Sequence, residues 1–228
     1  MSNKNLLQKN DFIEIEFIGK IKEGEIFDSN LKEALEKINP NYNENQTKPF
    51  IFSLGNDMFL KGVEDYLLKE GQPGKSYNIE LNPEDAFGIR NSKLVQLIPL
   101  NVFIQQKINP SQGMMFNFDG RIGKIISVSG GRVIVDFNHP LAGKKVIYDL
   151  KVLRKVEDIN EKTKSFIDFI FKKDFVFEIK NQDLFIKAEK QMKQFIELFK
   201  DKFKEVLNLN LQVELIPEDL SETLKKAQ

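Results

Sequence analysis

The sequence contains no cysteine and no tryptophan, and its one histidine is His139. Without cysteine there is no disulfide framework, no thiolate nucleophile and no cysteine-ligated metal site. A single histidine cannot build a multi-histidine metal site, and a histidine-based acid–base pair would have to use that one residue. His139 lies in the turn Asn138-His139-Pro140, where packing or a hydrogen bond is favoured over catalysis.

Net charge and long apolar runs are also absent. The 34 basic and 34 acidic residues cancel, which argues against a nucleic-acid partner because such proteins usually carry a basic excess. No stretch approaches the roughly 18 apolar residues of a membrane-spanning helix. Residues 1–11 lack the apolar core of a signal peptide. We therefore expect a cytoplasmic protein with no membrane partner.

Glycine and proline are unevenly distributed. All 13 glycines lie at or before Gly143, and seven of the eight prolines lie at or before Pro140. Because these residues mark turns, the first 150 residues are predicted to be rich in β-structure, with a boundary at residues 154–159. Alternating or helical spacing within this part predicts strands at 12–17, 50–54 and 77–81 and helices at 31–38 and 59–69.

Residues 91–137 form a separate segment with its own pattern of strands and turns. Apolar residues alternate over 94–98, and two hairpins are predicted, one turning at Asp119-Gly120 and one at Gly130-Gly131. The chain then returns to a long strand at 146–154. A segment that leaves one β domain and comes back to it indicates an inserted domain.

The last part has a different pattern. It predicts a helix at 159–171, two strands ending at 188, an amphipathic helix over 189–207 and a strand at 209–216. The order is α-β-β-α-β, a small α+β domain. The phenylalanine stripe of the second helix is most simply the core of this domain, and part of it could continue into a dimer interface.

Three stretches together resemble the FKBP-type peptidyl-prolyl cis-trans isomerases. They are Phe17-Ile18-Gly19 with Gly24-Glu25-Ile26-Phe27-Asp28-Ser29, then Pro49–Gly55 with Phe59–Glu64, and then Asn82–Gly88. The inserted segment and the return through residues 138–143 are similar to the SlyD branch, in which an insert-in-flap domain binds unfolded chain. The C-terminal part resembles the extra domain of long-chain archaeal relatives, where it implies dimerisation.

The resemblance implies an α+β fold in which an antiparallel sheet surrounds a helix. Three domains follow: a discontinuous FKBP domain of residues 1–90 and 138–156, an insert-in-flap chaperone domain of residues 91–137, and a C-terminal dimerisation domain of residues 157–228. The implied partners are unfolded or partly folded proline-containing polypeptides and a second copy of the chain.

Matched residue by residue, the resemblance implies an apolar pocket around one carboxylate, that of Asp28. The walls would be Phe17, Phe27, Phe52, Phe59, Leu60, Val63, Phe87 and Tyr148. Asp28 would act electrostatically and would not take a proton. The chain departs from the family at positions 17 and 87, where phenylalanine replaces the usual tyrosine, and at position 63, where valine replaces a large aromatic residue. We expect an isomerase of modest activity with weak affinity for macrolides.

Twisting an X–Pro bond breaks no covalent bond, so no cofactor is expected. Metal-binding relatives carry histidine- and cysteine-rich tails, which this chain lacks, so no metal site is expected either. Met114 and Met115 are ordinary strand residues or part of an adaptable apolar surface for unfolded chain. Two alternatives stay open: a holdase with vestigial isomerase activity, and a dimeric docking protein with a fixed partner.

Overall fold

The computed structural model describes residues 6–22 and 24–216. Within that range the chain forms two compact units, one of residues up to 79 together with those from 147 onward, and one of residues 80–146. The second unit contains the predicted insert of residues 91–137. The outer ends of the predicted first and third domains, residues 1–5 and 217–228, and also Glu23, lie outside the described residues. Among those that are described, no helix is long and apolar enough to cross a membrane.

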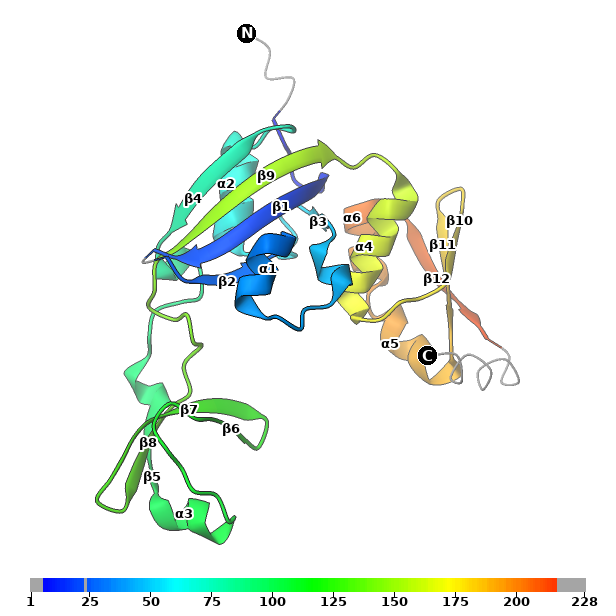
Figure 1. Ribbon diagram of the computed structural model, residues 1–228. Helices are drawn as coiled ribbons and strands as arrows, with labels where there is room; N and C mark the ends of the chain where they lie inside the picture. The colour runs from blue at the N-terminus through cyan, green and yellow to red at the C-terminus, as the bar shows by residue number, and fades with distance from the viewer. Residues whose placement is uncertain (1–5, 23, 217–228) are drawn as a thin grey trace. The chain divides into compact units, whose positions relative to one another are not determined.

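The first unit is built on a five-stranded sheet with the strand order β2-β1-β9-β4, in which β3 also pairs with β1 (Figure 1). One half of β1 pairs with β2 and the other half with β3, both antiparallel. Alternate residues of β1 and β9 are buried because successive side chains of a strand point to opposite faces. The strands are β1 (Phe12–Ile21), β2 (Ile26–Ser29), β3 (Phe50–Ser53), β4 (Ser76–Leu81) and β9 (Val146–Lys155).

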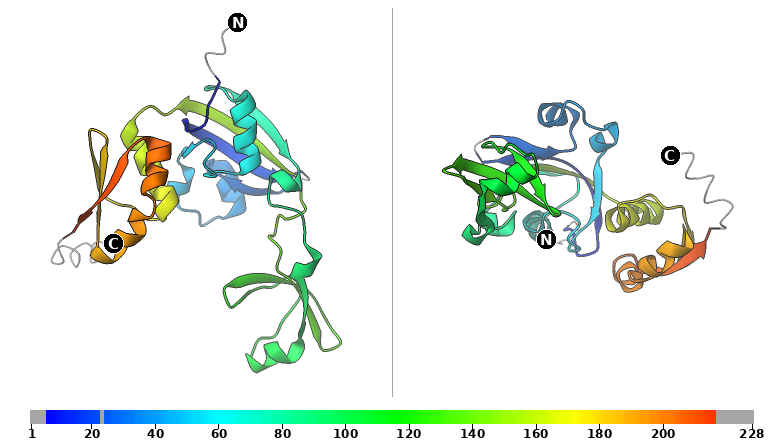
Figure 2. Two further views of the ribbon diagram at one scale, coloured as in Figure 1. Left: turned by 180° about the vertical axis from the view of Figure 1, so that it is seen from behind. Right: turned by 90° about the horizontal axis from the view of Figure 1, so that it is seen from below.

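Two helices accompany this sheet. Helix α1 covers Lys32–Ile38 and helix α2 covers Lys61–Glu70. Helix α2 lies against one face of the sheet (Figures 1 and 2) and buries Val63 and Leu67 completely. Its apolar residues recur at helical spacing, which is why one side of α2 can pack against the sheet.

The second unit holds a four-stranded antiparallel sheet with the order β5-β8-β7-β6. Its core consists of Phe103, Ile125, Val133 and Val135, with partly buried phenylalanines around it. The elements are β5 (Val95–Pro99), α3 (Leu100–Gln105), β6 (Met115–Phe118), β7 (Arg121–Ser129) and β8 (Arg132–Asp136).

The C-terminal part forms a third sheet, β10-β11-β12, in which β11 pairs antiparallel with β10 and parallel with β12. Helix α4 lies beside β3 (Figure 1), and the Ser165 hydroxyl donates a hydrogen bond of 2.5 Å to the Ile51 carbonyl. The elements are α4 (Ile159–Phe171), β10 (Phe177–Lys180), β11 (Asp183–Ala188), α5 (Lys190–Glu197), α6 (Lys200–Leu207) and β12 (Asn210–Leu215).

Phe166 of α4 joins the C-terminal part to the five-stranded sheet. Its side chain is completely buried, and its ring lies 6.4 Å from that of Phe12 on β1 and 5.0 Å from that of Phe203 on α6. Arg154 adds ion pairs to Glu14, at 2.6 Å, and to Glu161, at 2.7 Å. The C-terminal part therefore shares a core with the sheet.

One sequence expectation was wrong and one element was missed. The single helix predicted over 189–207 is two helices, α5 and α6, because the Leu198 and Phe199 amides bond to carbonyls only three residues back and tighten the chain into a turn. Helix α3 was not predicted at all. Its six residues are too few for helical spacing to be distinguished from that of a strand.

Phe166→Ala should lower the free energy of unfolding of the first unit by about 3–5 kcal/mol, because it empties a fully buried aromatic site. Phe195→Ala is the matched control: that side chain is 45% exposed, and its loss should cost less than about 1 kcal/mol. Urea unfolding followed by circular dichroism measures both. Equal losses for the two variants would contradict the shared core.

Candidate active site

Except for Phe87, the side chains expected in one pocket come from four strands, one loop and one helix of the first unit. Phe17 lies on β1, Phe27 and Asp28 on β2, Phe52 on β3 and Tyr148 on β9. Phe59 and Leu60 lie on the loop that follows β3, and Val63 lies in the first turn of α2. Residues far apart in the sequence are thus placed on one sheet and the helix behind it.

Phe59 is the centre of an aromatic cluster. Its ring centroid lies 5.0 Å from that of Phe17, 5.3 Å from Phe52, 5.5 Å from Tyr148 and 5.9 Å from Phe50. The contacts to Phe17 and Tyr148 are edge-to-face, which is a favoured arrangement of aromatic rings. The ring of Phe27 meets that of Tyr148 edge-to-face at 5.9 Å. We call the set Phe17, Phe27, Phe50, Phe52, Phe59 and Tyr148 the aromatic basin.

The basin has a buried floor and an accessible rim. Phe52 and Val63 have no exposed surface, and Tyr148 is 2% exposed. Phe27, Phe59 and Leu60 are only partly buried. A ligand that entered over the rim would therefore meet apolar rings and little water.

Gly19 is required by the close approach of two rings of the basin. A Cβ atom at this position would lie 3.0 Å from the Phe27 ring and 3.1 Å from Cε1 of Tyr148. Gly19 is also the cross-strand partner of Asp28. The glycine thus lets Phe27 and Tyr148 close over β1 directly beside the carboxylate.

Asp28 is the carboxylate at the edge of the basin. Desolvation by partial burial raises the pKa of its carboxyl group above the ordinary value, and a hydrogen bond from the Ser29 backbone N–H offsets part of that rise. Asp28 is itself an exposed residue of β2, so a ligand at the rim can reach its carboxylate.

A second carboxylate, Glu64, holds the loop that carries Phe59. The Glu64 side chain is buried, and its oxygens accept hydrogen bonds from the backbone N–H groups of Gly55 at 2.7 Å, Asn56 at 3.1 Å and Phe59 at 2.7 Å. Burial raises the pKa of Glu64, and these N–H groups act in the opposite direction. The loop between β3 and α2 is therefore fixed from the inside.

Phe87 belongs to the second unit, where its ring stacks on that of His139 at 4.8 Å. His139 Nδ1 accepts a hydrogen bond from the Leu141 backbone N–H. Packing and a hydrogen bond were the roles favoured for His139 from the sequence. The place of Phe87 in the pocket wall stays a prediction.

Two residues of the site were not predicted from the sequence. Phe50 stacks on Phe52 with a centroid distance of 5.7 Å and also contacts Phe59. Because residues two apart on a strand share a face, the alternation that indicated Phe52 could also have indicated Phe50. Glu64 had no such signal, since a buried carboxylate looks like any surface glutamate of a helix.

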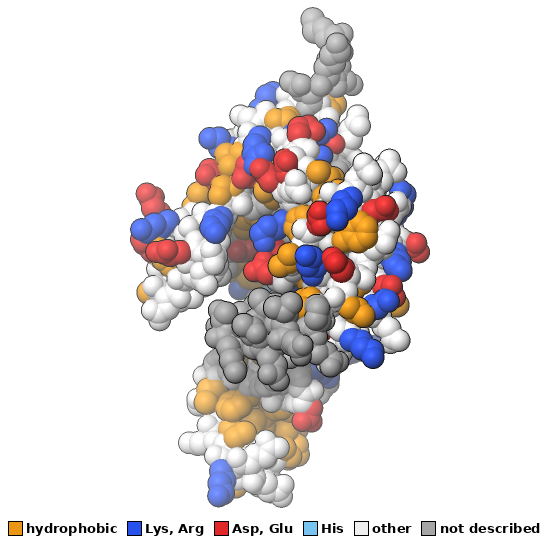
Figure 3. Space-filling model, turned by 90° about the vertical axis from the view of Figure 1, so that its right-hand side faces the viewer, with side chains coloured by type: hydrophobic (Ala, Val, Ile, Leu, Met, Phe, Trp, Pro, Cys, Tyr) orange, Lys and Arg blue, Asp and Glu red, His pale blue; other side chains and the backbone are white. Residues whose placement is uncertain are grey.

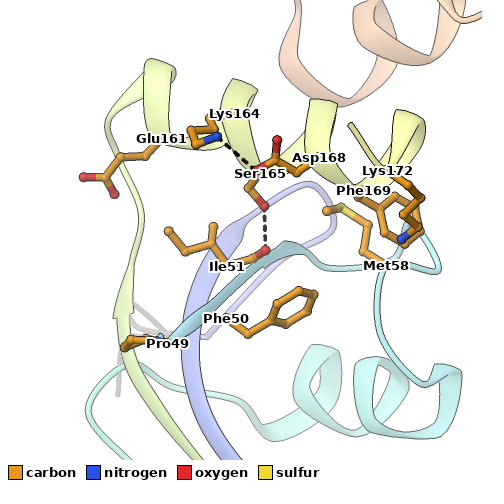
Figure 4. Close-up of a pocket in the computed structure, with 10 residues that line it drawn as sticks. All are labelled: Pro49, Phe50, Ile51, Met58, Glu161, Lys164, Ser165, Asp168, Phe169 and Lys172. Atoms are coloured by element: carbon orange, nitrogen blue, oxygen red, sulfur yellow. Dashed lines mark hydrogen bonds and ion pairs between the residues drawn. The ribbon is translucent and has the colours of Figure 1, made fainter. Parts of the chain in front are cut away.

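A cavity of about 420 Å³ opens next to the basin, between β3 and α4 (Figure 4). Phe50 lines both the cavity and the basin. The β3 side of the cavity is apolar, whereas the α4 side carries the ion pair of Lys164 with Asp168 at 3.3 Å. The lining residues are Pro49, Phe50, Ile51, Met58, Glu161, Lys164, Ser165, Asp168, Phe169 and Lys172.

Glu64→Gln should lower the free energy of unfolding by about 1–3 kcal/mol, because the amide NH₂ would face backbone N–H donors and leave them unpaired. Glu36→Gln, at an exposed position of α1, is the control and should change stability little. Thermal unfolding of both variants measures the difference. A Glu64→Gln protein as stable as the control would show that the carboxylate does not anchor the loop.

Asp28→Asn should raise the free energy of unfolding at neutral pH. A carboxyl whose pKa is raised by folding destabilises the folded state once it ionises, and this penalty disappears when the pH falls below the pKa of the unfolded chain. The gain should therefore vanish between about pH 7 and about pH 3.

Asp149→Asn provides a control of opposite sign. The hydrogen bond from Lys20, 2.6 Å away, lowers the pKa of Asp149, so this variant should be less stable than the wild type at neutral pH. Urea unfolding across the pH range tests both. A stability loss in both variants that is independent of pH would contradict the assignment of Asp28.

Two family models match the chain. The model described as FKBP-type peptidyl-prolyl cis-trans isomerase matches residues 3–118, and the model described as FKBP26, IF domain matches residues 96–141. The first of these covers just over half of the chain.

Curated relatives agree with these matches. The short-type peptidyl-prolyl cis-trans isomerase of Methanocaldococcus jannaschii is 30% identical over 148 residues, which are 65% of this chain and 93% of the relative. The FKBP-type 16 kDa peptidyl-prolyl cis-trans isomerase of Escherichia coli is 33% identical over 114 residues, 48% of this chain and 75% of the relative. The SlyD isomerase of Vibrio cholerae is 34% identical over 111 residues, 46% of this chain and 53% of the relative. The resemblance inferred from the motifs is thereby confirmed, and the chain belongs to the family of FKBP-type peptidyl-prolyl cis-trans isomerases.

Proposed function

We propose that the aromatic basin binds a proline-containing segment and isomerises its X–Pro bond. The observation that carries this proposal is the ring cluster around Phe59, with a dry floor and Asp28 as the carboxylate at its edge. The barrier to rotation is roughly 18–20 kcal/mol because the planar amide loses its resonance. The twisted amide has less charge separation than the planar one, so a water-poor apolar site favours it over the ground state.

Each residue then has a simple role. Phe17, Phe52, Val63 and Tyr148 form the floor that receives the proline ring, and Phe27, Phe59 and Leu60 form the walls. Asp28 acts through its charge on the carbonyl of the bound chain. Phe87 is assigned to the same site by the family resemblance alone. Since no proton is transferred and no covalent bond is made or broken, the reaction needs no cofactor and no metal.

We assign the capture of unfolded chain to the insert of residues 91–137. Eight of the thirteen exposed large hydrophobic residues of the described chain lie in the second unit. Hydrophobic side chains also gather over this unit on the face shown in Figure 3. Exposed apolar patches mark interaction surfaces. The eight residues are Ile89, Leu97, Val102, Ile104, Met114, Met115, Ile122 and Val128.

Register places several of these residues on one face of the four-stranded sheet. Met115 pairs with Lys124 and Asn117 with Ile122, so Met115 and Ile122 point to the side opposite the buried Gly123. Leu97, on the other edge strand, is 56% exposed, and Met115 is 54% exposed. Exposed apolar side chains that include an adaptable methionine suit chains of varied sequence.

The C-terminal part of residues 157–228 is proposed to mediate homodimerisation. On α5 and just after it, Phe195 and Leu198 are 45% and 78% exposed. Exposed aromatic and aliphatic side chains of this kind are typical of interfaces. The proposed setting is the cytoplasm, with partly folded polypeptides as clients.

Replacing Met115 and Ile122 together by threonine should reduce the rate of refolding of a proline-limited client protein several-fold. Turnover of a proline tetrapeptide should stay within about twofold, because the basin is unchanged. Threonine keeps a high β-propensity, so the sheet should persist. Val176→Thr is the matched control, since Val176 is 66% exposed in the other unit.

The same assays separate the alternatives. Loss of both activities in the double variant would contradict a division of labour between insert and basin. Suppression of aggregation without any tetrapeptide turnover by the wild type would favour a holdase. Failure to bind generic unfolded proteins would favour a docking protein with a fixed partner.

A further inference from the structure

Tyr148 contributes a hydroxyl to a basin that is otherwise lined by hydrocarbon rings. Its ring is 2% exposed and packs between those of Phe17, at 6.0 Å, and Phe27, at 5.9 Å. The edge of the ring, at Cε1, lies over Gly19, whose cross-strand partner is Asp28. The hydroxyl end of Tyr148 is thereby held on the Asp28 side of the basin.

This hydroxyl lacks a hydrogen-bond partner among residues 6–22 and 24–216. No hydrogen bond joins it to any residue in the described part of the chain, although nearly all buried polar groups in proteins have one. It is also not fully enclosed: among the described residues, the sealed side-chain oxygens without a partner are Asn56 Oδ1 and Thr163 Oγ1. The Tyr148 oxygen therefore keeps some accessible surface.

The surroundings keep the hydroxyl neutral. Burial, and secondly the charge of Asp28, raise the pKa of Tyr148 well above its ordinary value. Tyr148 is therefore a hydrogen-bond donor over the whole physiological pH range. In an apolar site such a donor gains more from an acceptor than it would in water.

We propose that the Tyr148 hydroxyl is the hydrogen-bond donor of the basin and that it binds a main-chain carbonyl oxygen next to the reacting amide of the proline segment. It would supply a hydroxyl in a chain that has Phe17 and Phe87 where the family usually has tyrosine. The inference rests on the proposed isomerase function of the basin and adds the specific contact that holds the substrate.

The neighbouring carbonyl is a better acceptor for this role than the reacting one. The planar amide carries more negative charge on its oxygen than the twisted amide, so a donor on the reacting oxygen would stabilise the ground state and slow the reaction. A donor that binds a neighbouring carbonyl stabilises the planar and the twisted form of the reacting amide equally. Tyr148 is therefore expected to affect binding and to leave kcat nearly unchanged.

Tyr148→Phe removes the oxygen and keeps the ring, so it isolates this contact. The dissociation constant of a blocked proline tetrapeptide, measured by NMR titration of the full chain, should rise roughly two- to tenfold, as expected for one lost hydrogen bond. The kcat for its isomerisation should change by less than about twofold. Tyr66→Phe, which removes a hydroxyl from the exposed side of α2, should leave both quantities unchanged.

A second measurement uses the wild-type chain and does not depend on any variant folding. With the Cζ atoms of the four tyrosines labelled with ¹³C, addition of the peptide should shift the Tyr148 resonance alone, because its hydroxyl becomes a donor. An unchanged dissociation constant in Tyr148→Phe, or an unmoved Tyr148 Cζ resonance at saturation, overturns the proposal. So does a loss confined to kcat. If the wild type binds the peptide but does not accelerate its isomerisation, the proposed function is refuted. The binding data would then still test whether the Tyr148 hydroxyl contacts the peptide.

Discussion

The buried carboxylate of Glu64 fixes the part of the chain on which the site depends. It accepts hydrogen bonds from three backbone N–H groups of the loop after β3, and these bonds fix the position of Phe59. Phe59 in turn contacts four other aromatic rings, from β1, β3 and β9. Leaving such N–H groups buried and unpaired would cost about 1–3 kcal/mol each, so the loop has a strong reason to keep this one conformation.

A rigid, dry basin suits a reaction that transfers no proton. The chain has one histidine and no cysteine, so it lacks the side chains that many enzymes use for acid–base or nucleophilic catalysis. Rotation about an X–Pro bond instead needs a site that holds the proline, excludes water and disturbs the planar amide. Apolar rings meet the first two needs, and Asp28 is the carboxylate to which we assign the electrostatic role. The phenol of Tyr148 supplies a fixed donor without adding a group that titrates near neutral pH.

Much of this arrangement could be predicted from the sequence. The motifs around Phe17, Asp28 and Phe59 contain glycines and alternating apolar residues. The glycines indicate turns, and the alternation indicates which face of a strand is buried. Helix α4 was predicted at its observed ends from its regular apolar spacing, and the structure adds that the Asp158 side chain caps its first turn. The family assignment followed from the order of these motifs and is confirmed by the comparisons.

The rest depends on tertiary contacts that leave no local trace. Nothing in the sequence separates Glu64 from a surface glutamate, since its role comes from the loop that folds over it. The break between α5 and α6 at Leu198 has neither glycine nor proline to mark it. The packing of Phe166 on Phe12 links residues more than 150 positions apart, and no spacing rule covers that distance.

The most direct test of the basin as the site of isomerisation is exchange NMR on a proline tetrapeptide, with the full chain labelled with ¹³C on its phenylalanine rings. We predict faster cis–trans exchange of the peptide, together with resonance shifts in Phe17, Phe27 and Phe59 and none in the C-terminal Phe195. Accelerated exchange that left these three rings unperturbed, or binding to them without any acceleration, would contradict it.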